Sequence, residues 1–162
     1  MSQLHLFEEI SSQSPLSLQL NIDGVARNNP GPAGAGICIF KDDQLLEAHG
    51  FYLGALTNNE AEYSALVIGL ALIAKLVSRG DRIVVVSDSE LLIRQLTGVY
   101  RVKKKELLHL YNRAQALVEE LRQRGVKDIT FRHVPRDENR CADKWANKGV
   151  DGRIPLPVDF HW

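Results

Sequence analysis

Hydrophobic and polar residues alternate strictly near the start of the chain. Between residues 18 and 23 every second residue is Leu or Ile, and the residues between them are Gln, Asn and Asp. This is the period of a strand with one buried face. Asp23 stands where the predicted strand ends, and the Asn, Pro and Gly residues at positions 28–32 then predict a turn before a second strand at residues 36–40. The pattern therefore predicts a hairpin with a long loop and a carboxylate at its mouth.

Beyond the hairpin, strand patterns alternate with helix patterns along the chain. Residues 44–53 predict a third strand, antiparallel to the second. Apolar residues then recur at helical spacing from Ala61 to Leu76, with capping side chains before them and Gly80 after them. The four β-branched residues at 83–86 are typical of a strand buried on both faces. Because a strand that follows a helix usually arrives by a parallel crossover, we expect this one beside the first strand.

The remaining pattern completes one α/β domain. Helices are predicted at residues 90–96, 107–121 and 140–148, and a fifth strand at residues 128–134. We expect a single domain over residues 17–150, preceded by a flexible extension at residues 1–16 and followed by a tail at residues 151–162 whose structure the pattern does not predict.

Composition and charge narrow the function classes. The chain has 162 residues, enough for one domain that buries roughly 70% of its unfolded surface. Its 20 basic and 20 acidic residues cancel, so any affinity for nucleic acid has to come from a local patch. No run of about 18 apolar residues and no signal-peptide pattern is present in the sequence. We therefore expect a soluble, cytoplasmic protein.

The two cysteines, Cys38 and Cys141, lie far apart in the sequence and lack the spacing of metal ligands. We expect them to be plain thiols in a reducing compartment, with a disulfide as the alternative.

Four carboxylates occupy similar positions at the ends of the predicted elements. Asp23 and Asp88 follow strands, and Glu62 and Asp143 stand in or near the first turns of helices. Each has an ordinary explanation as a turn residue, a cap or a partner of the helix dipole. If the four gather in one pocket, they repel by several kcal/mol unless a cation lies among them. Oxygen ligands of this kind favour Mg²⁺ or Mn²⁺, which usually share their shell with phosphate oxygens, and this indicates phosphodiester chemistry.

Four segments that contain these acids resemble the signature segments of type 1 ribonuclease H, and they occur in that family's order. They are Asp23-Gly24 with Asn29-Pro30-Gly31-Pro32, Thr57 to Tyr63, Ser87-Asp88-Ser89, and Glu138 to Asp143. The resemblance implies a ribonuclease H-like α/β fold, a five-stranded mixed sheet in the order 3-2-1-4-5 flanked by helices. It also implies an endonuclease that cuts the RNA strand of RNA/DNA hybrids.

The resemblance further implies roles for individual residues. Asp23, Glu62, Asp88 and Asp143 would hold two Mg²⁺ or Mn²⁺ ions for an in-line displacement that leaves a 3′-hydroxyl and a 5′-phosphate. We expect a monomer whose partner is the hybrid duplex rather than a membrane. For the Asn residues among the substrate-binding set, the alternative explanation is a role in turns and helix caps. For its basic residues, the alternative is that they form the solvated start of a helix. The expected substrate-binding residues are Gly24, Asn29, Asn58, Asn59, Ser89, Arg101, Lys103 and Lys104.

Two features depart from the family's pattern. The loop before the last helix has no His, and Arg136 is the candidate to stand in for it, although a guanidinium cannot act as a general base near neutral pH. For His133, on the predicted strand, we expect a structural role, with an auxiliary role in the site as the alternative. The sequence also resembles a short form, without a basic protrusion after Gly98 or a hybrid-binding module at residues 1–16. The alternative functions are a DNA nuclease of the wider superfamily and a non-catalytic hybrid-binding domain.

Overall fold

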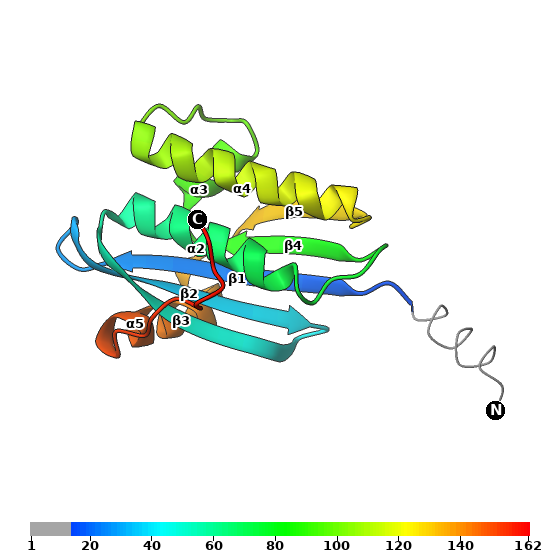
Figure 1. The fold of residues 1–162 in the computed structure, drawn as a ribbon, viewed down its shortest axis with the longest axis horizontal. Coiled ribbons are helices and arrows are strands. Elements are labelled where there is room, and N and C mark those ends of the chain that lie inside the picture. The colour runs from blue at the N-terminus through cyan, green and yellow to red at the C-terminus, as the bar shows by residue number, and fades with distance from the viewer. Residues whose placement is uncertain (1–13) are drawn as a thin grey trace.

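Five strands form one mixed sheet in the structure, a computed structural model that describes residues 14–162 (Figure 1). Most of the extension predicted at residues 1–16 therefore lies outside the described residues. The strand order is β3-β2-β1-β4-β5, with β1 antiparallel to β2 and parallel to β4. This confirms the order that the resemblance implies. The strands are β1 (Ser17–Ala26), β2 (Gly31–Lys41), β3 (Gln44–Leu56), β4 (Arg82–Ser87) and β5 (Asp128–His133).

Helices cover both faces of the sheet. Figure 1 shows α2 on one face with α4 packed beside it, and α5 on the opposite face. Leu20 and Ile22 of β1 are fully buried beneath α2, but Asn21 on the other face is only 4% exposed. The expectation that β1 has one buried face is therefore wrong, because α5 covers the polar face as well. The helices are α2 (Asn58–Ile73), α3 (Glu90–Leu96), α4 (Lys105–Gln123), the 3-10 turn η1 (Arg136–Glu138) and α5 (Arg140–Asp151).

The ends of two elements differ from the predicted ends. The prediction that the first strand stops at Asp23 is wrong: β1 continues to Ala26, β2 begins at Gly31, and Asp23 pairs with Gly36 inside the ladder. The small residues at positions 33–36 allow this longer hairpin, because β2 can then pass close beneath α5. Helix α2 ends at Ile73 rather than near Gly80, and turns follow it.

Two glycines let helices rest directly on the backbone of the sheet. A Cβ atom at Gly24 of β1 would collide with the backbone of Ala61 in α2, and one at Gly36 of β2 would collide with the backbone of Ala142 in α5. Side chains at these positions would hold the helices off the strands. The close approach fixes where the first turns of α2 and α5 lie relative to β1.

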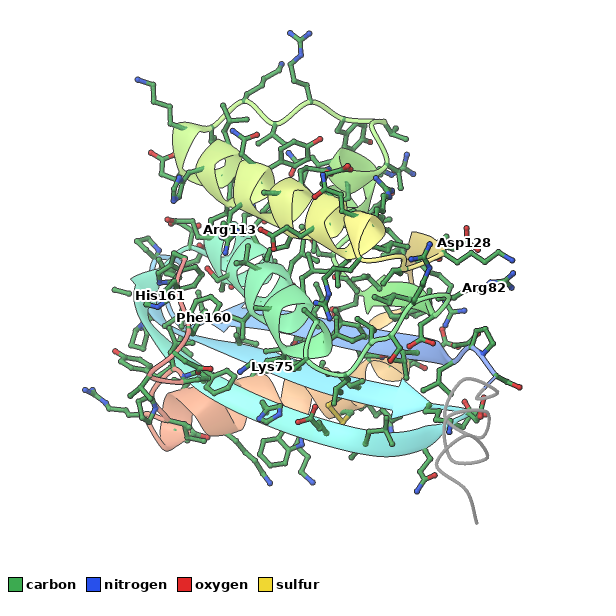
Figure 2. The ribbon with its side chains drawn as sticks, turned by 45° about the vertical axis from the view of Figure 1, so that its right-hand side comes forward. Lys75, Arg82, Arg113, Asp128, Phe160 and His161 are labelled. Atoms are coloured by element: carbon green, nitrogen blue, oxygen red, sulfur yellow. A yellow bond between two sulfur atoms is a disulfide. The ribbon has the colours of Figure 1, made fainter. Side chains whose placement is uncertain are left out.

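The two cysteines form a disulfide between β2 and α5, which Figure 2 shows as a yellow bond. The expectation of plain thiols at Cys38 and Cys141 is therefore wrong. Their separation of 103 residues hides the contact in the sequence, whereas the packing of α5 on β2 brings their Cα atoms to 6.4 Å. The bond ties the first turn of α5 to the sheet.

The C-terminal segment after α5 packs on the domain. The N–H of Tyr52 in β3 donates to the carbonyl of Ile154 at 2.7 Å. Leu156 and Phe160 pack against the hydrophobic core, and Figure 2 shows Phe160 beside α2. The segment therefore crosses from the α5 face to the α2 face around β3. Among residues 14–162, no helix has both the length and the apolar composition needed to cross a membrane.

A buried carboxylate fixes the end of the sheet opposite to Asp88. Asp81, 2% exposed, accepts the N–H groups of Leu16 and Ser78, both at 2.8 Å. We expect Asp81→Ala to lower the free energy of unfolding by about 2–4 kcal/mol, because two buried N–H groups lose their acceptor. Urea unfolding measures this. Asp128→Ala is the control: this carboxylate pairs with Arg82 at the surface (Figure 2) and should cost less than about 1 kcal/mol. Equal losses would contradict the prediction.

Candidate active site

The register of the two central parallel strands brings two carboxylates together. The parallel pairing of β1 with β4 ends at the pair Asn21 and Val86, so two residues later Asp23 and Asp88 lie side by side. Glu62 joins them from α2, where its Oε2 accepts the N–H of Gly24 at 3.1 Å. One carboxylate oxygen from each of Asp23, Glu62 and Asp88 lies within 4.8 Å of the others.

Asp143 completes the cluster from the first turn of α5. Its side chain is close enough to that of Asp23 to help raise the pKa of Asp23. One turn further along α5, Asn147 donates to the carbonyl of Asp143 at 3.0 Å. The Nη2 atom of Arg136 lies 3.9 Å from Oδ1 of Asp143. The structure thus brings all four predicted carboxylates to one edge of the sheet.

The cluster is not stable as four free anions. Burial, and then the charges of Glu62 and Asp88, raises the pKa of Asp23 to about 10. Burial and the charge of Asp88 raise the pKa of Glu62 to about 8, although the hydrogen bond with the side chain of Asp23 and that from the N–H of Gly24 oppose this rise. Without a bound cation, burial and the neighbouring charges therefore favour the protonated forms of Asp23 and Glu62.

An open hollow of about 390 Å³ lies over the acids. Asp23, Glu62 and Asp88 line it together with Asn147, and Arg136 supplies a positive charge at its wall. The cluster offers carboxylate oxygens and no thiolate or imidazole among the described residues. This donor set fits a hard divalent cation such as Mg²⁺ or Mn²⁺, with room left for an anionic ligand.

Two of the predicted substrate-binding amides interlock beside this hollow. The N–H of Asn58 donates to Oδ1 of Asn29 at 2.9 Å, and Oδ1 of Asn58 accepts the N–H of Ala26 at 3.0 Å. Both amide oxygens therefore join the β1–β2 turn to the start of α2. Their side-chain N–H groups can still donate hydrogen bonds to a ligand. The structural role of these two residues is therefore compatible with the predicted role in substrate binding.

The other predicted substrate-binding residues are spread over several surroundings. Asn59 and Lys104 line a second hollow of about 240 Å³ between the starts of α2 and α4. Arg101 lines a different hollow, near Tyr100, and Lys103 is exposed in the loop before α4. The basic run is therefore split, and Lys104 is its member beside α2.

Gly24, Ser89 and His133 have evident structural roles. Gly24 is buried against α2. Ser89 caps α3, since its Oγ accepts the N–H of Leu92 at 3.2 Å. His133, at the end of β5, places Nε2 3.3 Å from the carbonyl oxygen of Asp88. It therefore contacts the edge of the cluster rather than the hollow.

Sequence reasoning missed two residues of the site. Asn147 lines the hollow and stands four residues after Asp143, and this helical spacing could have indicated that Asn147 lies beside that carboxylate. Asn139 is 1% exposed and donates to Oδ1 of Asp88 at 3.2 Å. Its position just before a predicted helix indicates a cap, which concealed the contact with Asp88.

Sequence comparison identifies a matching family model and related proteins. A family model described as "Reverse transcriptase-like" matches residues 21–149. A bifunctional protein of Mycobacterium tuberculosis is 37% identical over 138 residues, which cover 84% of this chain and 36% of that protein. The chain thus spans about a third of the length of this relative. Ribonuclease H of Coxiella burnetii is 31% identical over 152 residues, 88% of this chain and 95% of its own.

Solved structures with a similar fold come from the same kind of protein as the relatives found by sequence. The N-terminal RNase H domain of the mycobacterial protein superposes with a TM-score of 0.76 at 35% identity, over 85% of this chain and 96% of the solved one. LC11-RNase H1, solved in complex with an RNA/DNA hybrid, gives a TM-score of 0.75 at 36% identity, over 83% and 97%. Because the likeness in sequence and in fold extends over nearly the whole of the shorter relatives, the chain belongs to the type 1 ribonuclease H family.

Proposed function

We propose that this chain is a metal-dependent endonuclease that hydrolyses the RNA strand of RNA/DNA hybrids. The convergence of Asp23, Glu62 and Asp88 within 4.8 Å at an open hollow, with Asp143 beside Asp23, carries the proposal. The hybrid bound to LC11-RNase H1 supports the class of substrate.

The four carboxylates would hold the divalent cations. Two Mg²⁺ or Mn²⁺ ions, when bound, would lower the pKa of an attacking water and stabilise the departing 3′-oxygen, which yields a 3′-hydroxyl and a 5′-phosphate. Asp23 and Glu62 have to lose their protons for this, because burial raises the pKa of both. We therefore expect metal affinity to rise with pH.

Substrate selection would fall to the amides at the start of α2 and the β1–β2 turn and to Lys104, which lines the second hollow. The 2′-hydroxyls of RNA line the wide minor groove of an A-like duplex. Asn58 lines the hollow with its amide oxygen already engaged, so its nitrogen would donate to such a hydroxyl. Asn29 and Asn59 lie beside it along the same turn and helix start. Lys104 would contact a backbone phosphate of the other strand.

Arg136 would attend the phosphate that is cut. Its guanidinium lines the hollow 3.9 Å from Asp143 and is largely exposed. A positive charge there would offset the charge that develops on the phosphate and would help the anionic product to leave. Since Arg keeps its proton near neutral pH, Arg136 would not accept a proton from the attacking water.

One assay tests the proposed function. Labelled RNA/DNA hybrid, double-stranded RNA and duplex DNA are each incubated with Mg²⁺, Mn²⁺ or EDTA, and the products are sized on a gel. We expect the RNA strand of the hybrid to be cut with either metal and none of the substrates to be cut in EDTA. A polymerase should extend the products, because they end in a 3′-hydroxyl. Cleavage of duplex DNA alone would indicate a DNA nuclease, and tight binding of the hybrid without cleavage a non-catalytic domain.

A further inference from the structure

The side chain of Asn139 does not cap the helix that it precedes. Asn at this position normally accepts a hydrogen bond from an N–H of its own helix, but Asn139 makes no such bond to α5. Its amide instead points into the sheet and is 1% exposed. There Nδ2 donates to the carbonyl of Ile22 at 2.9 Å and to Oδ1 of Asp88 at 3.2 Å.

Asn139 therefore contacts the surroundings of three of the four carboxylates. Ile22 immediately precedes Asp23 on β1, and Asp88 follows β4. The carbonyl of Asn139 itself accepts the N–H of Asp143 at 3.2 Å. One buried residue thus joins β1, the end of β4 and the first turn of α5.

Two further amides fix the orientation of Asn139. Nδ2 of Asn21 donates to Oδ1 of Asn139 at 3.0 Å, and Nε2 of Gln19 donates to Oδ1 of Asn21 at 2.7 Å. Since the oxygen of Asn139 is occupied, both of its N–H groups are directed at Ile22 and Asp88. Buried amides such as Asn21 and Asn139 stabilise the fold only when each has its partner, and this row ends on a carboxylate of the site.

We propose that Asn139 is a positioning residue for the metal-binding carboxylates. By holding Oδ1 of Asp88, it leaves the other oxygen of that carboxylate to face the hollow. By joining β1 to α5, it sets the spacing between Asp23 and Asp143. The inference rests on the proposed function, because it assumes that these acids bind divalent cations. Loss of such an outer hydrogen bond typically weakens metal affinity about 10- to 100-fold.

Calorimetric titration with Mn²⁺ alone tests the proposal without an activity assay. Asn139→Ser keeps a capping residue before α5, but its side chain is one bond too short to reach Asp88 as Asn does. We expect Asn139→Ser and Asn139→Ala to bind Mn²⁺ at least about 10-fold more weakly than the unmodified chain. Asp81→Ala is the control. It loses buried hydrogen bonds before the start of β4, at the opposite end of the strand from Asp88, so it should lose stability but keep its Mn²⁺ affinity.

The possible results distinguish a failure of this inference from a failure of the proposed function. If the unmodified chain binds no Mn²⁺, the proposed function fails and this inference falls with it. If the unmodified chain binds and a folded Asn139 variant binds equally well, the inference alone is overturned. Should neither Asn139 variant show a cooperative unfolding transition, Asn21→Ala decides. It removes the donor that orients Asn139 and should weaken Mn²⁺ binding, whereas unchanged affinity would overturn the proposal.

Discussion

Asp23→Asn is expected to abolish metal-dependent cleavage while the protein stays folded. The substitution keeps the size of the side chain and removes the charge at the centre of the cluster, where Asp23 is 4% exposed. Loss of several kcal/mol of stabilisation of the transition state lowers the rate on the order of 1,000-fold or more. Initial rates on labelled hybrid at saturating Mg²⁺ measure the effect. Asp128→Asn, the same change at an exposed position, should leave the rate unchanged.

Asp23→Asn should also be more stable toward unfolding than the unmodified chain when metal is absent. Burial raises the pKa of Asp23 from its usual 3.8 to about 10, so the folded protein holds a proton that the unfolded chain releases. The resulting stability is fully present below about pH 4 and is lost as the pH rises toward 10, by at most about 1.4 kcal/mol per pH unit. In EDTA, the stability of the unmodified chain should therefore fall from pH 5 to pH 8, and that of Asp23→Asn should fall less. Near-normal turnover by Asp23→Asn, or equal pH slopes, would contradict the assignment.

The succession of strands and helices along the chain, and the positions of the acids within them, could be predicted from the sequence because both depend on local signals. Alternation at residues 18–23 and the β-branched run at residues 83–86 identify two strands, and their parallel pairing follows from the helix between them. Asp23 and Asp88 each stand two residues beyond the last pair of this parallel register, Asn21 and Val86, so they lie next to one another. Asp23 and Asp88 could be brought together by this reasoning alone.

Features that depend on how the layers pack could not be predicted in this way. Asn21 occupies a polar position in an alternating strand, and only the packing of α5 on that face buries it. Cys38 and Cys141 meet for the same reason. Asn139 carries the local signature of a helix cap, but its amide donates instead to the buried carbonyl of Ile22 and to the half-buried carboxylate of Asp88. In each case a contact between elements distant in sequence prevails over the local pattern.

Gly24→Ala is expected to damage both the fold and the site. A Cβ atom at this position would meet the backbone of Ala61 and Glu62 rather than a flexible side chain, so α2 has to move away from β1. We expect the free energy of unfolding to fall by about 3 kcal/mol. The hydrogen bond from the N–H of Gly24 to Glu62 would lengthen with that movement. A shift of about 1 Å in a reacting group costs about 100-fold in rate.

A second glycine separates this effect from a general cost of substitution. Gly54→Ala in β3 meets no atom within 4 Å, but it places a side chain at a φ of +79°, which costs about 1–2 kcal/mol. Urea unfolding and initial rates, measured where both variants are folded, should show that Gly54→Ala is destabilised yet fully active. Gly24→Ala should lose cleavage and Mn²⁺ affinity together, because the shift of α2 carries Glu62 away from Asp23. If the folded Gly24→Ala protein cleaves as fast as Gly54→Ala, the close contact between β1 and α2 is not what sets the geometry of the carboxylates.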